Sequence, residues 1–266
     1  MFRFRWRFVI HGGIDGFSRA VVFLHASDNN RQDTVLQDFL VAAATFGIPS
    51  RIRVDDGGEN NAICSFMEVI RGQEHNAAIR GSSVHNQRIE RFWRDMWFGV
   101  TNTFYNLFYF LEDRNYLNCD NEQHLWALHY VFLPRINTAL DKFQQQWNNH
   151  GIRTEHNRTP LQLFVGQALH LSNSLLTEVQ EFFHHSDTSD SSAADQVGLN
   201  YRPDSAANVA ADEHAPRVSV PAIPCPLSDE QLTVLRTSVD PTDSLTDSLG
   251  VTSYLKAIAC IQELTG

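Results

Sequence analysis

The spacing of hydrophobic and polar positions changes along the chain, and its first 25 residues predict two strands. Residues 3–10 and 18–25 are runs of β-branched and aromatic residues, and the glycine-rich segment at 11–16 lies between them. Two such runs around a turn-forming segment are typical of an antiparallel β-hairpin. We therefore predict a hairpin at the start of the chain.

A helical period follows the hairpin. From Asn29 onward, apolar residues recur at the intervals expected for one face of a helix. These residues are Val35, Leu36, Phe39, Leu40, Ala43 and Phe46. Gly47 and Pro49 interrupt the pattern, so we expect the helix to end there.

Shorter elements come next. The sequence RIRV at 51–54 alternates as a strand and leads into the acidic, glycine-containing turn at 55–58. We predict a helix over about 61–72 and a weak strand near 77–80. A small, polar loop at 81–85 separates that strand from the next element.

The strongest apolar stripe predicts a long helical region after this loop. Its members are Ile89, Phe92, Trp93, Met96, Trp97, Val100, Phe104, Leu107, Phe108 and Leu111. A second helical stretch is predicted over about 121–148, and Pro160 marks the start of a short helix. Strands followed by alternating helices and strands indicate an α/β fold with a mixed sheet.

The composition changes at about Ser186, where Ser, Asp, Ala, Asn and Pro become frequent. Such a composition favours disorder, so we predict a linker at 186–224, preceded by a helical extension at 171–185. Short helices are expected in the tail at 225–266, where Ser228 is a plausible cap. From Ser186 onward the chain holds twelve of its 31 acidic but only four of its 21 basic residues, so the net charge of −10 arises mainly there.

The composition also excludes several classes of protein. No apolar run of about eighteen residues is present, so no membrane span is expected. The four cysteines form no CxxC pair, which argues against a zinc site or a disulfide framework and favours free thiols inside the cell. Only Lys142 and Lys256 are lysines. The dominant cation is therefore arginine, whose planar guanidinium suits phosphate.

Two polar segments contain candidate chemistry, RVDDGGEN at 53–60 and VHNQRIERFWRD at 84–95. Asp55 follows a predicted strand, so its carboxylate is expected at the carboxyl edge of the sheet, where ligands bind in open α/β sheets. Glu90 is expected near the start of the long helix. Two carboxylates brought together repel unless a cation lies between them, and Mg²⁺ prefers oxygen ligands. Paired ions of this kind cleave and join phosphodiesters.

Each of these residues also has a simpler interpretation. An acidic turn at 55–58 is by itself typical of the end of a strand, and Glu90 by itself is an ordinary solvated helix residue. Arg88, Arg91 and Arg94 either contact phosphate or form a solvated helix face with local ion pairs. The aromatic stripe that follows is expected to be core.

The order of the motifs resembles the integrase core family of eukaryotic mobile elements, which is related to retroviral integrases. The segments that carry the resemblance are GGIDGFSR at 12–19, DDGGEN at 55–60, VHNQRIERFWRD at 84–95 and WNNHGIRTEHNRTP at 147–160. The likeness covers about residues 3–170. It implies a core at 1–170 with a ribonuclease-H-like mixed sheet flanked by helices.

The resemblance also implies a function, metal-dependent DNA cleavage and strand transfer. Asp55 and Glu90 would be catalytic and would hold Mg²⁺ or Mn²⁺. DNA is the expected partner, a homo-oligomer is compatible with the family, and the expected location is the nucleus. The implied nucleic-acid contacts are Asn86, Arg88, Arg91 and Arg94.

The chain departs from the family at one point. The family's active site is an Asp-Asp-Glu triad whose first Asp ends the first strand, but IDGFSR at 14–19 resembles the second strand. The first Asp is therefore expected upstream of Met1, so that the core lacks its first strand. Asp15 in that role remains an alternative.

Three functions thus stay open. The first is an incomplete integrase core, and the second is a non-catalytic, domesticated module that binds nucleic acid or protein. The third and weaker interpretation is a ribonuclease H that acts on RNA–DNA hybrids.

Overall fold

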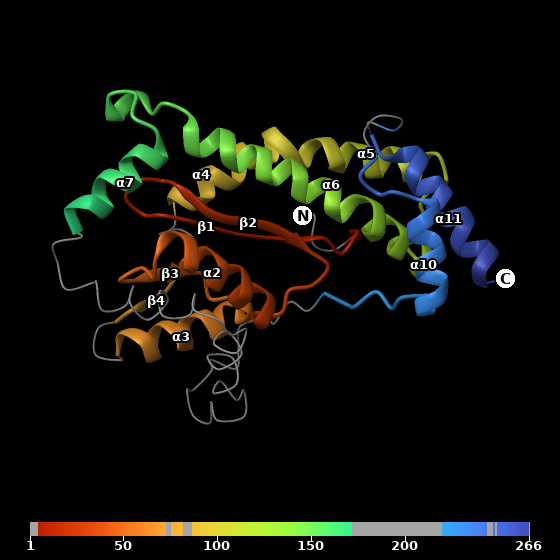
Figure 1. The fold of residues 1–266 in the computed structure, drawn as a ribbon, viewed down its shortest axis with the longest axis horizontal. Coiled ribbons are helices and arrows are strands. Elements are labelled where there is room, and N and C mark those ends of the chain that lie inside the picture. Colours follow the sequence, from red (N-terminus) through yellow and green to blue (C-terminus); the bar gives the residue numbers. More distant parts are fainter. Residues whose placement is uncertain are drawn as a thin grey trace.

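The computed structural model shows an α/β chain built from two small pairs of strands and a set of long helices (Figure 1). The residues that it describes are 5–72, 76–81, 87–171, 220–243, 247 and 249–265. The predicted α/β class is therefore confirmed, whereas the ribonuclease-H-like arrangement stays a prediction. Within the described ranges, no helix has the length and apolar character needed to cross a membrane.

The predicted antiparallel hairpin is present. Strand β1 (Val9–Ile14) pairs with strand β2 (Val21–Ser27), and His11 lies opposite His25. The glycine-rich segment that was expected to be the turn belongs mostly to β1. The first strand also begins later than the predicted range of 3–10.

The residues before β1 form an anchor, and the prediction of a strand there is wrong for residues 5–8. Trp6 is buried, and its indole Nε1 donates to a carboxylate oxygen of Glu112 at 2.6 Å. Arg5 forms a bidentate ion pair with the same carboxylate, and Arg7 forms another with Glu122. These charge-assisted bonds tie the start of the chain to distant helices.

A second group of elements follows the hairpin, close to the predicted boundaries. It consists of helix α2 (Gln32–Phe46), strand β3 (Ile52–Val54), the 3-10 helix η1 (Gly58–Asn60), helix α3 (Asn61–Arg71) and strand β4 (Ala78–Arg80). Strands β3 and β4 are parallel, so their carboxyl ends lie at the same edge. A small core holds this group together: Val35, Phe39, Ala43, Ile63, Met67 and Ala77.

The two pairs of strands are not joined into one sheet within the described residues. The β1–β2 pair is antiparallel and the β3–β4 pair is parallel. Both pairing modes of a mixed sheet are therefore present, but the predicted sheet is observed only as two separate parts.

The long apolar stripe forms three successive helical segments. They are helix α4 (Gln87–Met96), the π-helical turn η4 (Trp97–Thr101) and helix α5 (Asn102–Asp113). The turn packs closely on helix α6 (Glu122–Asn149) at Gly99, where a Cβ would lie 2.8 Å from the ring of Phe143. Glycine permits this approach because it has no Cβ.

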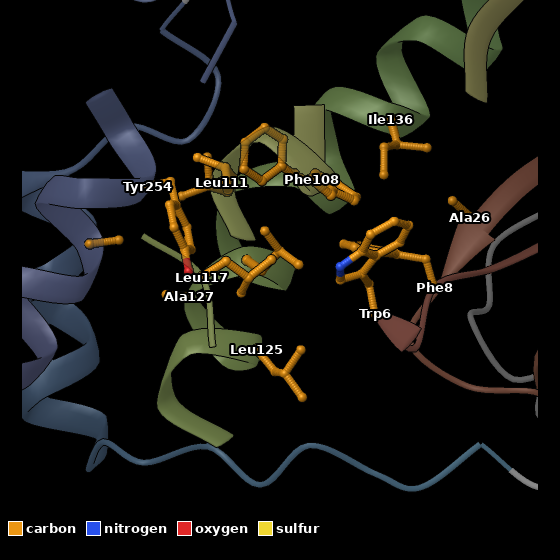
Figure 2. Close-up of a cluster of buried hydrophobic side chains, with 14 of the residues drawn as sticks. Trp6, Phe8, Ala26, Phe108, Leu111, Leu117, Leu125, Ala127, Ile136 and Tyr254 are labelled. Carbon is orange, nitrogen blue, oxygen red and sulfur yellow. The ribbon is translucent and has the colours of Figure 1, made fainter. Parts of the chain in front are cut away.

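Helix α6 runs along the hairpin and through the main core (Figure 1). Figure 2 shows large side chains from distant parts of the chain in this core, among them Trp6, Phe108 and Tyr254. The rings of Trp6 and Phe108 meet edge to face at 5.3 Å. Burial of each aromatic side chain contributes about 1.5–3 kcal/mol. The expectation that the aromatic stripe is core is confirmed.

Helix α7 (Pro160–Leu171) begins at Pro160, as predicted, after the 3-10 helix η5 (Arg153–Glu155). The predicted extension at 171–185 and linker at 186–224 lie outside the described residues, apart from Leu171 and the segment 220–224. The helical extension and the linker therefore remain predictions.

The C-terminal tail contains two helices that pack into the main core. Helix α10 (Asp229–Ser238) is capped by Ser228, whose hydroxyl accepts a hydrogen bond from the backbone N–H of Gln231 in a capping box. Helix α11 (Val251–Thr265) buries Tyr254 against α6. The predicted cap and helices are confirmed, whereas the division into domains remains a prediction.

Arg135 on α6 holds the loop between these two helices. Its guanidinium donates to the carbonyl oxygens of Pro241, Asp243 and Asp247, at 2.6, 2.8 and 2.9 Å. The side chain thus satisfies three carbonyl groups of a segment more than one hundred residues away in the sequence.

Candidate metal and nucleic-acid site

Asp55 lies directly after β3, at the carboxyl end of the parallel β3–β4 pair, as the sequence predicted. Its side chain is exposed, and the amide of Asn60 donates to Oδ1 at 2.6 Å. Strand β4 ends at the same edge, where the N–H of Gly81 donates to the carbonyl of Val54 at 3.3 Å. One carboxylate oxygen of Asp55 is therefore fixed, while Oδ2 has no hydrogen bond within the described residues.

The turn after Asp55 concentrates negative charge. Asp56 is exposed beside it, and the carboxylate of Glu59 folds over Gly57, where a Cβ would lie 2.6 Å from Oε2. The Glu59 carboxylate thus lies close to the backbone of the turn. The turn is rich in oxygen atoms of the kind that hard cations prefer.

Glu90 lies in the first turn of α4 and is exposed. Phe92 and Met96 on the same helix are buried, so Glu90 occupies the side of the helix away from the core. Its predicted position near the helix start is confirmed. Asn86 lies outside the described residues, and its role stays a prediction.

A short stretch of chain connects the edge at Asp55 with the helix that carries Glu90. Strand β4 ends at Arg80 and α4 begins at Gln87, so the connecting chain spans at most roughly 25 Å. In the described part of the chain, no group of three or more His, Cys, Asp or Glu side chains is placed to hold a metal ion. The shared site of these two carboxylates therefore remains a prediction.

Three arginines project from the outer side of α4. Arg88, Arg91 and Arg94 are all exposed. The only ion pair described for them joins Arg94 to Asp95 at 3.8 Å, and such long, exposed pairs contribute little. The guanidinium groups are therefore accessible to a phosphate backbone, and their contact with DNA stays a prediction.

Asp15 has a structural role in the turn between β1 and β2. Its Oδ2 accepts hydrogen bonds from the N–H of Phe17 at 3.1 Å, and from the N–H and hydroxyl of Ser18 at 2.6 and 2.7 Å. Aspartate commonly closes turns in this way. These bonds account for Asp15 without a metal ion.

The segment at 147–160 packs against the same hairpin. The amide of Asn148 accepts from the N–H of Val21 at 2.8 Å and donates to its carbonyl at 2.9 Å. The indole of Trp147 donates to the carbonyl of Arg19 at 2.9 Å. Two of the motifs singled out in the sequence are therefore in direct contact.

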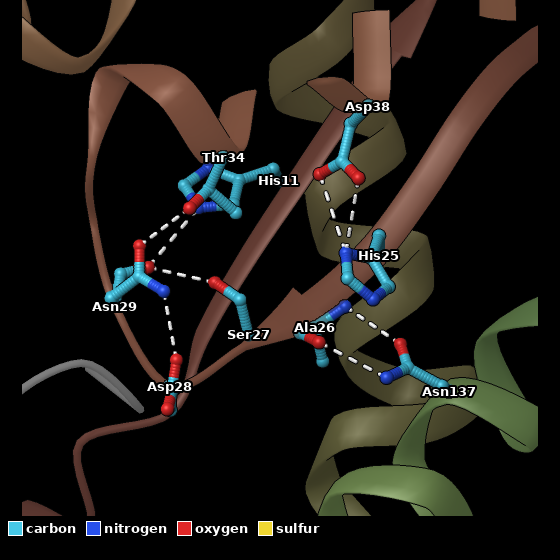
Figure 3. A network of polar contacts seen from close by, with 9 residues as sticks. All are labelled: His11, His25, Ala26, Ser27, Asp28, Asn29, Thr34, Asp38 and Asn137. Carbon is cyan, nitrogen blue, oxygen red and sulfur yellow. Dashed lines mark hydrogen bonds and ion pairs between the residues drawn. The ribbon is translucent and has the colours of Figure 1, made fainter. Parts of the chain in front are cut away.

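A polar network that the sequence did not reveal joins the hairpin to α2 and α6 (Figure 3). Nδ1 of His25 lies 3.2 Å from a carboxylate oxygen of Asp38, and this hydrogen bond raises the pKa of His25 despite its partial burial. The amide of Asn137 pairs with the N–H and carbonyl of Ala26 at 2.8 and 3.0 Å. The network positions the hairpin relative to α2 and α6.

Comparison with known families decides what kind of chain this is. Residues 1–178 match the family model described as integrase core domain, which is more than half of the 266 residues. The chain belongs to the integrase core domain family. The predicted family is therefore confirmed, and an origin related to mobile-element integrases follows from it. No curated protein and no solved structure matches the chain.

The integrase core match includes Asp55, Glu90 and the four motifs, but it ends before α10 and α11. The two C-terminal helices nevertheless bury side chains in the main core of the matched region. An integrase core thus has an additional packing layer here, formed by its own tail.

Proposed function

We propose that this integrase core protein binds DNA and a divalent cation, and that its ancestral reaction is DNA cleavage and strand transfer. One observation carries the proposal. Asp55 lies at the carboxyl end of the parallel strands, with one carboxylate oxygen fixed by Asn60 and the other accessible. Glu90 lies in the first turn of α4. A nuclear location accords with this function.

The donor set fits a hard cation. Both proposed ligands are exposed carboxylates, and neither forms an ion pair with a basic side chain within the described residues. Mg²⁺ and Mn²⁺ favour such oxygen ligands and retain several waters. Two protein ligands instead of the family's three would give weak binding, so we expect a low affinity for either ion.

The residues of the site divide the chemistry among them. When bound, the ions activate a hydroxyl and stabilise the leaving oxygen of a phosphodiester. Asp55 and Glu90 would share one ion, and Asn60 keeps the Asp55 carboxylate in one orientation. Arginines on α4 contact the phosphates and position the DNA strand. In this reaction the hydroxyl oxygen would bond to phosphorus as the bond between phosphorus and the leaving oxygen breaks, without a covalent enzyme intermediate.

We also propose that the core lacks one strand. The β1–β2 and β3–β4 pairs each have no third strand in the part of the chain that the structure describes, which agrees with the expectation that the family's first strand is missing. That strand would bring the first Asp of the triad. An in-frame strand ending in Asp, encoded just before Met1, would be the direct support for this proposal.

A strand-transfer assay tests the proposed chemistry. The chain and a version extended by the in-frame upstream segment would be incubated with labelled DNA and Mn²⁺, alongside Asp55→Asn, Glu90→Gln and the neighbouring control Asp56→Asn. We expect the extended version to join DNA, and either site substitution to abolish joining while the control does not. Joining that survives both site substitutions rules out the proposed ligands.

A non-catalytic module is the second candidate. It is favoured by the engagement of the Asp15 carboxylate in the turn and by the lack of a three-ligand metal group among the described residues. DNA binding without Mn²⁺-dependent joining, even in the extended version, would identify this alternative.

A further inference from the structure

Phe98 is a large apolar side chain that faces solvent on the same helical run as the long apolar stripe, but outside the stripe itself. It is 71% exposed, whereas Phe92, Met96 and Val100 on the same helical run are buried. Single exposed apolar residues are common on protein surfaces. Exposure alone therefore does not indicate a binding role for Phe98, and the side chains around it have to be considered.

The helical spacing places Phe98 in line with two arginines. Arg91, Arg94 and Phe98 stand at positions i, i+3 and i+7, which lie on one side of a helix. All three are exposed, and about 10 Å of helix separates the first from the last. Arg88 lies nearly one turn before Arg91.

The π-helical turn fixes the outward position of Phe98. Gly99 approaches α6 so closely that a Cβ would lie 2.8 Å from the ring of Phe143. Val100 and Thr101 are buried on the inner side of the same turn. That inner side is thus filled, which leaves Phe98 toward solvent. Turns of this type are frequent at functional sites.

The charges beside the ring favour a polyanion. Glu90 and Asp95 also lie on α4, but Asp95 is within 3.8 Å of Arg94, and Glu90 is assigned to the cation in the proposed function. Arg88 and Arg91 have no ion pair among the described residues. Arginines next to an exposed ring combine phosphate contact with a flat apolar surface.

We propose that Phe98 stacks on an unpaired base of DNA whose phosphates contact Arg91 and Arg94. Single-strand sites with little sequence preference are built from such aromatic rings beside basic side chains. The bases of a duplex are stacked on one another and offer Phe98 no free face. The inference rests on the proposed function and specifies its substrate, DNA with a single-stranded end or gap.

Binding of the full chain to a labelled oligothymidylate, and to a blunt duplex of the same length, tests this inference. Phe98→Ala removes the ring, and Phe98→Trp keeps a ring and adds a fluorophore. Phe110→Ala is the matched control, since Phe110 is an exposed phenylalanine further along α5. Thermal melts would check that each variant is folded.

We expect Phe98→Ala to weaken oligothymidylate binding about 5- to 150-fold and to leave duplex binding unchanged. Phe98→Trp should restore binding, and its added fluorescence should be quenched by the oligonucleotide. Equal binding by wild type and Phe98→Ala would overturn the inference while leaving the proposed function intact. So would a change in oligomeric state of Phe98→Ala without DNA, since Phe98 would then contact a second copy. If the wild type binds neither the oligothymidylate nor the duplex, the proposed function is contradicted as well.

Discussion

Two aspartates that follow strands in this chain differ in their hydrogen bonds. Oδ2 of Asp15 accepts three hydrogen bonds from its own turn, whereas among the residues that the structure describes the Asp55 carboxylate accepts one, from the amide of Asn60. The sequence presents both as acids in glycine-containing turns after predicted strands and cannot separate the two cases. Asp15 is therefore a turn residue, and Asp55 is the better candidate for a ligand.

Replacement of Asp15 should affect stability and leave metal binding unchanged. Asp15→Ala removes three hydrogen bonds and leaves two backbone N–H groups of the turn without their partner. We expect a loss of about 1–2 kcal/mol in the free energy of unfolding, measured by urea denaturation. Asp55→Ala, at an exposed site, should cost less than about 0.5 kcal/mol. The reverse order of the two effects would contradict this assignment.

The pair of His25 and Asp38 should make stability depend on pH. Because Asp38 raises the pKa of His25 above its ordinary value of 6.5, the folded state binds the proton more tightly. The stabilisation is full below pH 6.5 and is lost as pH rises through the folded-state pKa. The stability difference between wild type and Asp38→Asn should thus be larger at pH 6 than at pH 9. An equal stability difference at the two pH values would contradict a pH-dependent stabilisation by the His25–Asp38 pair.

His129 should have the opposite effect on the pH dependence of stability. It is buried, its Nε2 hydrogen-bonds to the carbonyl of Trp6 at 2.7 Å, and burial lowers its pKa below 6.5. A lowered histidine pKa means that the unfolded state binds more protons, so stability falls as pH drops below 6.5. Comparison of wild type with Asp38→Asn cancels this contribution, because both proteins contain His129.

At the scale of elements, local pattern predicted the helices well and the long-range contacts poorly. Helices α2, α3 and α6 lie close to their predicted ranges because one apolar face of each is buried. The run at 3–10 has a strand pattern, but Arg5 reaches Glu112, 107 positions away, and the anchor replaces the strand. The break at η4 depends on Gly99 packing against α6, which no local pattern contains.

The amide side chains of α6 should be important for the position of β2. Asn148 is buried and satisfies both backbone groups of Val21. Asn148→Leu leaves these groups without partners, so we expect a loss of about 1–3 kcal/mol in urea denaturation. The exposed neighbour Asn149, whose amide bonds only within its own helix, is the control. A loss in Asn149→Leu as large as in Asn148→Leu would refute the role of the paired amide.

At the scale of the whole molecule, the tail helices and the integrase core share one hydrophobic core. The capping residue Ser228 and the apolar period predicted the helices, but the burial of Tyr254 against α6 depends on contacts that only the folded chain brings together. The candidate site is limited in the same way. The sequence predicts which residues could bind a cation, whereas their meeting depends on how distant elements assemble.

Loss of Tyr254 should therefore weaken the whole molecule and not only the tail. The side chain is fully buried, and Tyr254→Ala should cost about 3–5 kcal/mol in a single unfolding transition. The adjacent, partly exposed Leu255 provides the control, since Leu255→Ala should change stability much less. A separate early transition for the tail in calorimetry would show instead that it unfolds independently.

The central claim concerns a divalent cation shared by two carboxylates. The most direct test is Mn²⁺ binding, measured by electron paramagnetic resonance, to wild type, Asp55→Asn, Glu90→Gln, the double variant and the control Asp56→Asn. If one ion contacts both side chains, each single substitution weakens binding about tenfold or more and the double variant binds little worse than either. Unchanged affinity in both single variants, or independent losses that simply add, would contradict the claim.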